Sequence, residues 1–167
     1  MRILGLDPGS RHTGYGFVDR GIDRRRLRPV AYGRLSPPRD TALVARLAHL
    51  ASALDALLQR HAPDVAVLES LYHGVNPRAL IVLAQARGAL LTTLGRAGVA
   101  VHEYTPAEIK SAVTGSGRAD KAQVARMVRL ELGLRDDDLA DDTTDALAVA
   151  ICYAQRAAFD RLRETAR

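Results

Sequence analysis

The chain has very little cysteine and no long apolar run, and each shortage excludes a class of protein. Its 167 residues include one cysteine, Cys152, which cannot form an internal disulfide and is expected to be an inert core residue. The longest apolar run, Ala146–Ala154, is far shorter than the ~20 residues that a membrane-spanning helix requires. Met1 leads directly into a strand pattern, so no signal peptide is expected. A reducing, cytoplasmic setting is therefore predicted.

The length and composition favour one globular domain. A chain of 167 residues is long enough to bury about 70% of its unfolded surface without disulfides or other staples. Residues 1–167 are therefore expected to form a single domain, with a basic C-terminal tail from about residue 158.

The charge is unevenly distributed. Lys and Arg number 24 against 19 Asp and Glu, but six aspartates crowd between Asp136 and Asp145. The rest of the surface is correspondingly more basic, with arginine runs at Arg24–Arg26 and Arg156–Arg167. A basic surface around an acidic pocket suits a polyanion that is held through its phosphates. Each arginine run can equally be a solvated turn or a frayed tail, so neither is assigned to a site.

Hydrophobic periodicity predicts strands early in the chain and alternating strands and helices later. Short connections between the first three strands favour an antiparallel meander, and the later alternation favours parallel strands with crossover helices. The expected fold is α/β, a mixed five-stranded sheet flanked by helices. The predicted strands are 2–7, 14–18, 27–35, 65–69 and 99–104, and the predicted helices are 41–60, 76–95, a short helix after the capping box at 105–108, 119–132 and 142–158.

Four acidic residues stand where apolar elements end or begin. Asp7 and Glu69 each close an apolar strand, while Asp142 and Asp145 lie one helical turn apart at a helix N-terminus. Carboxylates gathered at such edges repel by roughly 4 kcal/mol per pair at 4 Å. Protons or hard cations must neutralise them, so the pattern predicts an oxygen-ligand site for Mg²⁺ or Mn²⁺. Two such ions can activate water and stabilise the leaving oxygen of a phosphodiester.

The same residues belong to segments that carry a family resemblance. The sequence ILGLDPGSR at 3–11 is followed by TGYG at 13–16, ESLY at 69–72, QARG at 85–88 and DTTDALA at 142–148, with Lys110 and Lys121 between the last two. In this order, over nearly the whole chain, the motifs resemble those of the RuvC-type Holliday-junction resolvases. The tripeptide Asp-Pro-Gly alone would be a weak signal.

The resemblance implies an RNase H-like fold and a homodimer. The implied function is Mg²⁺-dependent, paired and symmetric nicking of four-way DNA junctions in recombination and repair. It further implies two Mg²⁺ ions per site, Mn²⁺ as a substitute, and partnership with a branch-migration helicase complex. The roles it assigns are metal ligands at Asp7, Glu69, Asp142 and Asp145, a junction-contacting aromatic ring at Tyr72, and catalytic, DNA-contacting lysines at Lys110 and Lys121.

Three other functions are consistent with parts of the pattern. An RNase H-like nuclease acting on another structured nucleic acid, such as RNA, would use the same carboxylates. Sugar-kinase and actin-like ATPases also open with a strand, an aspartate and a glycine-rich turn, but they need a second domain and a second phosphate loop. A non-catalytic junction-binding protein would not need four carboxylates.

The helical segment from Asn76 to Gly95 is the predicted dimer surface. A four-way junction has two-fold symmetry, so two symmetric nicks call for a C₂ dimer with an isologous interface. The segment carries more apolar positions than one sheet-facing stripe requires, although burial within the monomer would explain the same pattern. The positions are Leu80, Leu83, Leu90, Leu91 and Leu94, interleaved with Ala84, Ala86 and Ala89.

Overall fold

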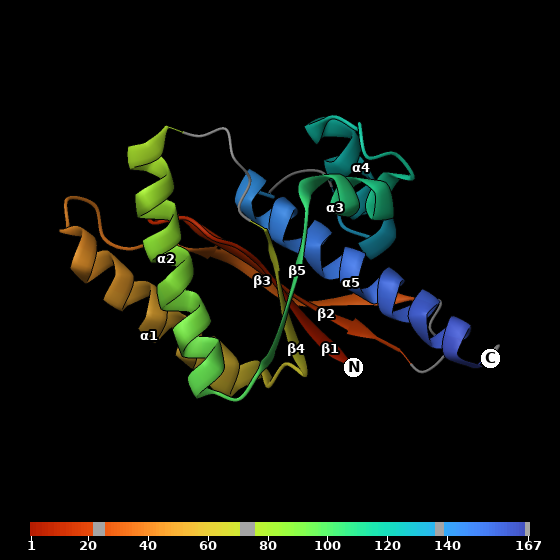
Figure 1. The fold of residues 1–167 in the computed structure, drawn as a ribbon, viewed down its shortest axis with the longest axis horizontal. Helices are drawn as coiled ribbons and strands as arrows, with labels where there is room; N and C mark the ends of the chain where they lie inside the picture. Colours follow the sequence, from red (N-terminus) through yellow and green to blue (C-terminus); the bar gives the residue numbers. More distant parts are fainter. Residues whose placement is uncertain (22–25, 71–75, 136–138, 166–167) are drawn as a thin grey trace.

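The computed structural model describes residues 1–21, 26–70, 76–135 and 139–165, and for residues 158–165 it describes the backbone alone. A five-stranded sheet lies at the centre, with helices on both sides (Figure 1). The elements within the described residues are β1 (Arg2–Asp7), β2 (Thr13–Arg20), β3 (Leu27–Leu35), α1 (Leu43–His61), β4 (Val65–Glu69), α2 (Pro77–Arg96), β5 (Ala100–Tyr104), α3 (Pro106–Thr114), α4 (Lys121–Leu132) and α5 (Asp141–Thr165).

The sheet is mixed, as the connection lengths predict. Its strand order is β3-β2-β1-β4-β5. The strands β1, β2 and β3 pair antiparallel, whereas β4 pairs parallel with both β1 and β5. The helices α1 and α2 make the connections into β4 and β5. Consequently β1, β4 and β5 all present their carboxyl ends at one edge, where open α/β sheets bind ligands.

Local capping explains where the shorter helices begin. The predicted capping box is confirmed at α3, where Thr105 and Glu108 exchange side-chain and backbone hydrogen bonds. The helix α4 begins two residues later than predicted because Asp120 is its N-cap, accepting from the Gln123 amide. The helix α5 is longer than predicted and reaches Thr165.

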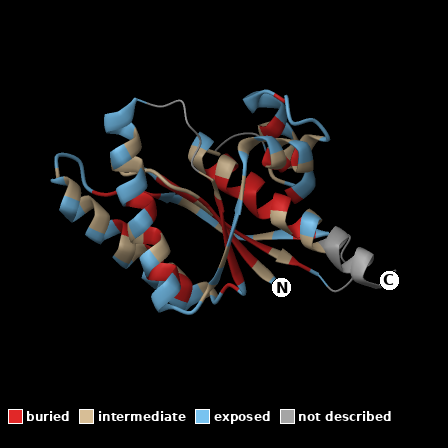
Figure 2. Cartoon of the chain, viewed as in Figure 1, coloured by how far each residue is buried: buried red, intermediate tan, exposed pale blue. Residues whose placement is uncertain are grey.

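Alternation along the strands divides the core into two layers. Ile3, Val65 and Val67 pack with α3, α4 and α5 on one face. Leu4 and Leu68 pack with α1 and α2 on the other. Buried residues therefore line both sides of the sheet and the inner sides of the helices (Figure 2).

On one face, α5 lies directly on the strand backbones. A Cβ atom added at Gly5 would lie 1.9 Å from the Ala146 carbonyl oxygen, and one added at Gly14 would lie 1.8 Å from the Asp142 carbonyl oxygen. No side chain can occupy either position without moving the helix. Glycine at these two positions is thus what brings the start of α5 against β1 and β2.

On the other face, large side chains separate the helices from the sheet. Leu54 of α1 and Leu90 and Leu94 of α2 are fully buried there. Ala86 is also fully buried. The alternative of burial within the monomer therefore holds for Leu90, Leu94 and Ala86, because the monomer's own core contains all three.

Two further predictions concern membrane-spanning helices and the single cysteine. Within the described ranges, no helix is both long and apolar enough to cross a membrane. Cys152 is fully buried, and burial raises the pKa of its thiol to about 11. A thiol with so high a pKa forms little thiolate, so the prediction of an inert core residue is confirmed.

Candidate active site

The ends of two adjacent parallel strands carry the first two acids. Leu6 of β1 is in register with Leu68 of β4, so Asp7 and Glu69 occupy the next position on each strand. By strand alternation both side chains lie on the face that α5 covers, as Ile3 and Val67 do.

The first two turns of α5 carry the other two acids. Because α5 lies on Gly5 and Gly14 without intervening side chains, Asp142 and Asp145 are brought close to the carboxyl end of β1. Thr143, which lies between them in sequence, is turned inward and almost fully buried. The two aspartates remain partly exposed at the mouth of the site.

The pKa values identify the four carboxylates as one electrostatic cluster. Burial, followed by the charges of Asp145, Asp142 and Glu69, raises the pKa of Asp7 to about 7. Burial and then Asp145 also raise the pKa of Glu69, and burial raises that of Asp145. The structure therefore brings together the four acids that the sequence singled out.

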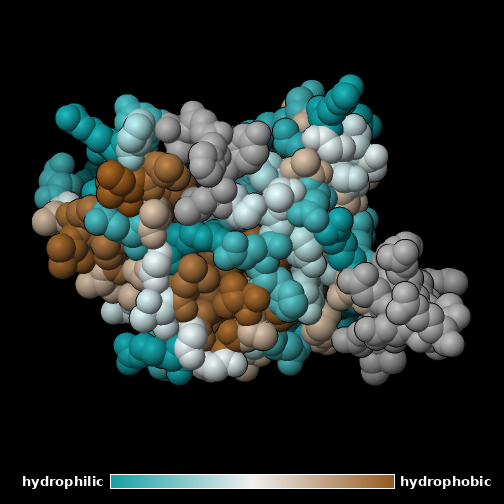
Figure 3. All heavy atoms as spheres, viewed as in Figure 1, coloured by the Kyte–Doolittle hydropathy of each residue, from teal (hydrophilic) through white to brown (hydrophobic). Residues whose placement is uncertain are grey.

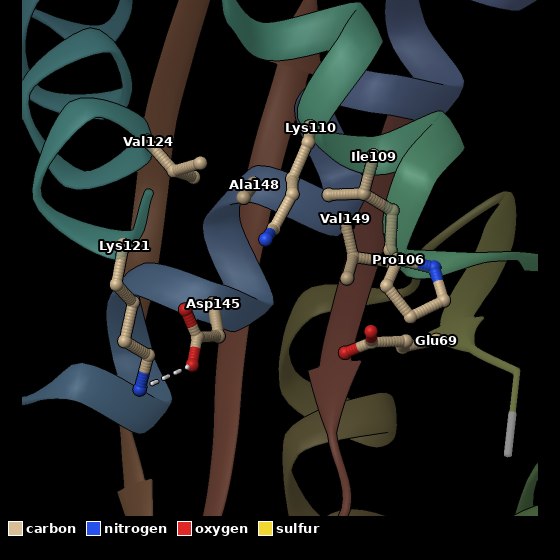
Figure 4. Close-up of a pocket in the computed structure, with 9 residues that line it drawn as sticks. All are labelled: Glu69, Pro106, Ile109, Lys110, Lys121, Val124, Asp145, Ala148 and Val149. Carbon is tan, nitrogen blue, oxygen red and sulfur yellow. Dashed lines mark ion pairs between the residues drawn. The ribbon is translucent and has the colours of Figure 1, made fainter. Parts of the chain in front are cut away.

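Both predicted lysines border the same cavity. This cavity has a volume of about 430 Å³ and is lined by Glu69, Asp145, Lys110 and Lys121 together with apolar residues of α3, α4 and α5. Figure 4 shows Lys110 extending from α3 toward the space between Asp145 and Glu69. Lys121 Nζ lies 3.1 Å from Asp145 Oδ2, and this contact leads the causes that raise the pKa of Lys121.

The donor set fits a hard divalent cation, although it is not a closed cage. All four acids offer oxygen, the ligand that Mg²⁺ and Mn²⁺ prefer. Among the described residues, no three Asp, Glu, His or Cys side chains converge into a ready-made metal cluster. Cationic side chains stand beside two of the acids instead: Lys121 pairs with Asp145, and Arg34 Nη1 lies 3.6 Å from Asp142 Oδ2.

One buried arginine supports the site and had been given no role from the sequence. Arg87 of α2 is 5% exposed, and its Nη1 donates to the Glu69 carbonyl oxygen at 2.7 Å. Its Nη2 forms an ion pair with Glu103 Oε1 at 2.7 Å, at an angle unsuited to a hydrogen bond. The signal was available, because Arg87 falls on the same helical stripe as Leu83, Leu90 and Leu94, and a charge on a buried stripe needs a partner.

Tyr72, the predicted junction-contacting residue, lies outside the described residues, as do Asp136–Asp138 of the aspartate-rich segment. The role of Tyr72 stays a prediction.

Comparison with protein families adds an independent result. A family model described as "Crossover junction endodeoxyribonuclease RuvC" matches residues 3–153. A protein of that name from Anaeromyxobacter sp. is 46% identical over 159 residues, which cover 95% of this chain and 83% of the relative. One from Halorhodospira halophila is 48% identical over 153 residues, covering 92% and 89%.

Solved structures resemble this one over almost its whole length. Thermus thermophilus RuvC in complex with a Holliday junction substrate superposes with a TM-score of 0.88 at 29% identity, covering 96% of each chain. The yeast mitochondrial Holliday junction resolvase superposes with a TM-score of 0.69 at 14% identity, covering 98% of this chain and 84% of the other. The second likeness is one of fold alone.

Proposed function

The chain belongs to the RuvC family of crossover junction endodeoxyribonucleases, and from this membership we propose how its own residues resolve four-way DNA junctions. It is an endonuclease that acts on Holliday junctions in recombination and repair. Residues 1–167 act as one RNase H-like domain that makes paired, symmetric nicks. The observation that carries the mechanism is the gathering of four carboxylates beside two lysines at one edge of the sheet.

The four carboxylates would hold the metal. Asp7, Glu69, Asp142 and Asp145 together offer enough oxygen ligands for two divalent ions, Mg²⁺ by preference with Mn²⁺ as a substitute. When bound, such ions supply the charge that activates water and stabilises the leaving oxygen of a phosphodiester. They would also relieve the mutual repulsion that, after burial, raises the pKa of Asp7.

The two lysines would bind the scissile phosphate. Lys110 reaches into the space between Glu69 and Asp145, where its ammonium group can neutralise a non-bridging phosphate oxygen. Lys121 neutralises Asp145 in the structure and offers a second cation at the same cavity. We assign Tyr72 to stacking on an unpaired base at the junction centre, a contact worth about 1–3 kcal/mol per base.

Cleavage of a synthetic mobile four-way junction tests the function. We expect two nicks at symmetric positions with Mg²⁺ or Mn²⁺, and none in EDTA. Linear duplex DNA and a structured RNA of equal length serve as substrate controls. Cleavage of the RNA in preference to the junction would favour a different RNase H-like nuclease. Binding without scission in Mg²⁺ would indicate a non-catalytic junction protein.

The proposed dimer surface is the N-terminal half of α2. Ile81 is 59% exposed there, and Leu80 and Leu83 are half-buried, whereas the C-terminal half faces the core. Figure 3 shows hydrophobic side chains gathered on the side of the molecule formed by α1 and α2. A symmetric contact here would place two active sites at a fixed separation, as paired nicking requires. A branch-migration helicase complex is the further partner that we propose from family membership.

Sedimentation tests the dimer. Wild-type protein should sediment as a dimer at micromolar concentration, and Ile81→Glu should give monomers that nick poorly and asymmetrically. Leu130→Glu is the matched control, because Leu130 is a similarly exposed apolar residue, at 65%, on the distant helix α4. A monomeric wild type that still makes paired nicks would refute the dimer, as would dissociation by both substitutions alike.

A further inference from the structure

A second cavity, here called the arginine cavity, lies between the β1–β2 turn and the β3–α1 connection. Its volume is about 470 Å³. Two prolines form part of its wall. Its polar lining residues are Arg11, His12, Arg39, Asp40, Thr41 and Arg46.

Within the described part of the chain, the guanidinium groups of this cavity have no ion-pair partner. Three arginines face one carboxylate, Asp40, and no acidic side chain of the described residues lies within ion-pair distance of any of the three. Arg46 is the most enclosed: its Nε is shielded from solvent, and no atom of the described residues accepts its hydrogen bond. Buried donors are normally satisfied, so an acceptor from outside the protein is expected.

The start of α1 adds to the positive potential of the arginine cavity. Its N-cap is Ala42, which offers no side-chain acceptor, and its first turn contains no acidic residue. The first backbone N–H groups of a helix lack intrahelical partners and carry the positive end of the helix dipole. By contrast, side chains cap α2, α3 and α4. The dipole of α1 therefore adds positive potential beside the three guanidinium groups.

Hydrogen bonds hold the walls of the cavity in place. His12 Nδ1 lies 3.0 Å from Ser36 Oγ, which joins the β1–β2 turn to the β3–α1 connection. Thr13, fully buried, donates through Oγ1 to the Gly9 carbonyl oxygen at 2.8 Å and fixes the turn. Thr41 Oγ1 donates to the Pro38 carbonyl oxygen at 2.9 Å. The arginines are thus presented by a braced loop pair.

The sheet register places the arginine cavity beside the acidic cluster. Asp7 pairs with Gly14, and Thr13 pairs with Leu35, so the two loops leave the sheet at the edge where the acids lie. The cavity reaches toward α1, on the face opposite α5 and the two active-site lysines. The carboxylates therefore have cations on both sides: Lys110 and Lys121 on one, and the arginine cavity on the other.

We propose that the arginine cavity binds a backbone phosphate of the junction DNA, so that the strand to be cut is held on both sides of the acidic cluster. Guanidinium groups suit this ligand because they donate two parallel hydrogen bonds to one phosphate. This inference rests on the proposed junction-cleaving function and adds to it a second phosphate contact. Held at two points, the strand crosses the carboxylates in one register.

The test is the salt dependence of junction binding in EDTA, where cleavage is absent. Arg11→Gln/Arg39→Gln should bind the junction about 10-fold more weakly at moderate salt, with a slope of log Kd on log salt smaller by about 1, since one lost phosphate contact removes about 0.9. Arg46→Lys keeps the charge but loses the forked geometry, so it should weaken binding and keep the slope. Arg60→Gln, at the exposed far end of α1, is the matched control and should change neither quantity.

Two further arms make the outcome decisive. Neutral methylphosphonates are introduced one at a time near the cleavage point. At one position the substitution should weaken junction binding by the wild type. At that position it should not weaken binding by the arginine variant any further. Inorganic phosphate is the second probe: if it protects the wild type against heat while the variants bind the junction normally, the cavity is a free-anion site. Wild-type cleavage with unchanged slopes in the variants would overturn this inference and leave the proposed function standing.

Discussion

The two faces of the sheet hold their helices in different ways. On one face, α5 touches the strand backbones at Gly5 and Gly14 with no side chain between. On the other, α1 and α2 stand off from the sheet on leucine side chains such as Leu54 and Leu90. A leucine layer can repack by small rotamer changes, whereas two backbones in direct contact cannot adjust in this way.

The four acids lie on the face of the sheet that α5 covers. Catalytic groups must be held within about 0.5 Å of the productive geometry. Asp7 comes from a strand and Asp145 from a helix, so their separation depends on how closely α5 approaches β1. The comparison shows that the four acids lie on the face where backbone contacts fix the position of the helix. The side-chain packing that can adapt lies on the face covered by α1 and α2.

The largest expected effect comes from removing one carboxylate on the α5 face. Asp7→Asn should lower junction cleavage by at least about 100-fold, because metal-ion charge stabilisation is worth several kcal/mol. Junction binding should stay within about 3-fold, since phosphate neutralisation supplies most of the affinity. Gel assays of cleavage and binding check both. Asp64→Asn, which changes an acid just before the start of β4, is the control, and near-normal cutting by Asp7→Asn would remove Asp7 from the ligand set.

A methyl group placed under α5 should be the next most damaging change. Gly5→Ala should lower the free energy of unfolding by about 3 kcal/mol and reduce cleavage as well, because the helix must move away from Asp7. Gly95→Ala is the matched control: nothing lies within 4 Å of its added Cβ. In that helix position alanine should stabilise by about 0.5–1 kcal/mol. Denaturant titrations measure the free energy of unfolding of both variants. Equal values for Gly5→Ala and Gly95→Ala would contradict this prediction.

A truncation on the opposite face should change stability alone. Leu54→Ala should lower the free energy of unfolding by about 2–5 kcal/mol, the usual cost of a buried cavity. Cleavage per folded molecule should be unchanged, because α1 holds none of the four acids. Activity measured well below the unfolding midpoint, normalised to the folded fraction, checks this. A large fall in that normalised rate would show that the leucine layer also sets the active-site geometry.

The smallest expected effect is a pH dependence confined to the α5 face. The pKa of Asp7 is raised from 3.8 to about 7, so the folded protein holds this proton more tightly than the unfolded chain does. The free energy of unfolding of metal-free protein should therefore fall between about pH 4 and pH 7. The free energy of unfolding should fall by an amount on the order of 2 kcal/mol. A pKa difference of about three units allows at most about 4 kcal/mol.

Denaturation in EDTA across this pH range measures the effect. It should be smaller in Asp7→Asn and should be opposed by Mg²⁺, whose binding requires the ionised carboxylates. A metal-free stability that rises steadily from pH 4 to pH 7 would contradict the raised pKa of Asp7.

Much of this arrangement is local and could be predicted from the sequence. Strand ends at Asp7 and Glu69, the capping box at Thr105 and the one-turn spacing of Asp142 and Asp145 all follow from patterns a few residues long. Those patterns also predict the mixed sheet, because connection length limits how strands can pair.

The features that could not be predicted depend on contacts between distant segments. Gly5 reads as an ordinary strand residue until α5 is seen lying on it. Arg87 carried no assigned role until the carbonyl group of Glu69 was found beside it. Periodicity alone could not separate the core positions of α2 from its interface positions, so the burial of Leu90 and Leu94 in the monomer could not be predicted.

The position of α5 at the end of the chain also determines when, during synthesis, the four acids can come together. This helix is made last among the described elements, yet it packs against β1 and β2, which are made first. During synthesis, Asp7 and Glu69 leave the ribosome long before Asp142 and Asp145, and domains complete their folding only when such distant contacts close. A nascent chain that stops short of α5 therefore lacks two of the four proposed metal ligands, and we expect DNA cutting to begin only once that helix has been synthesised and docked.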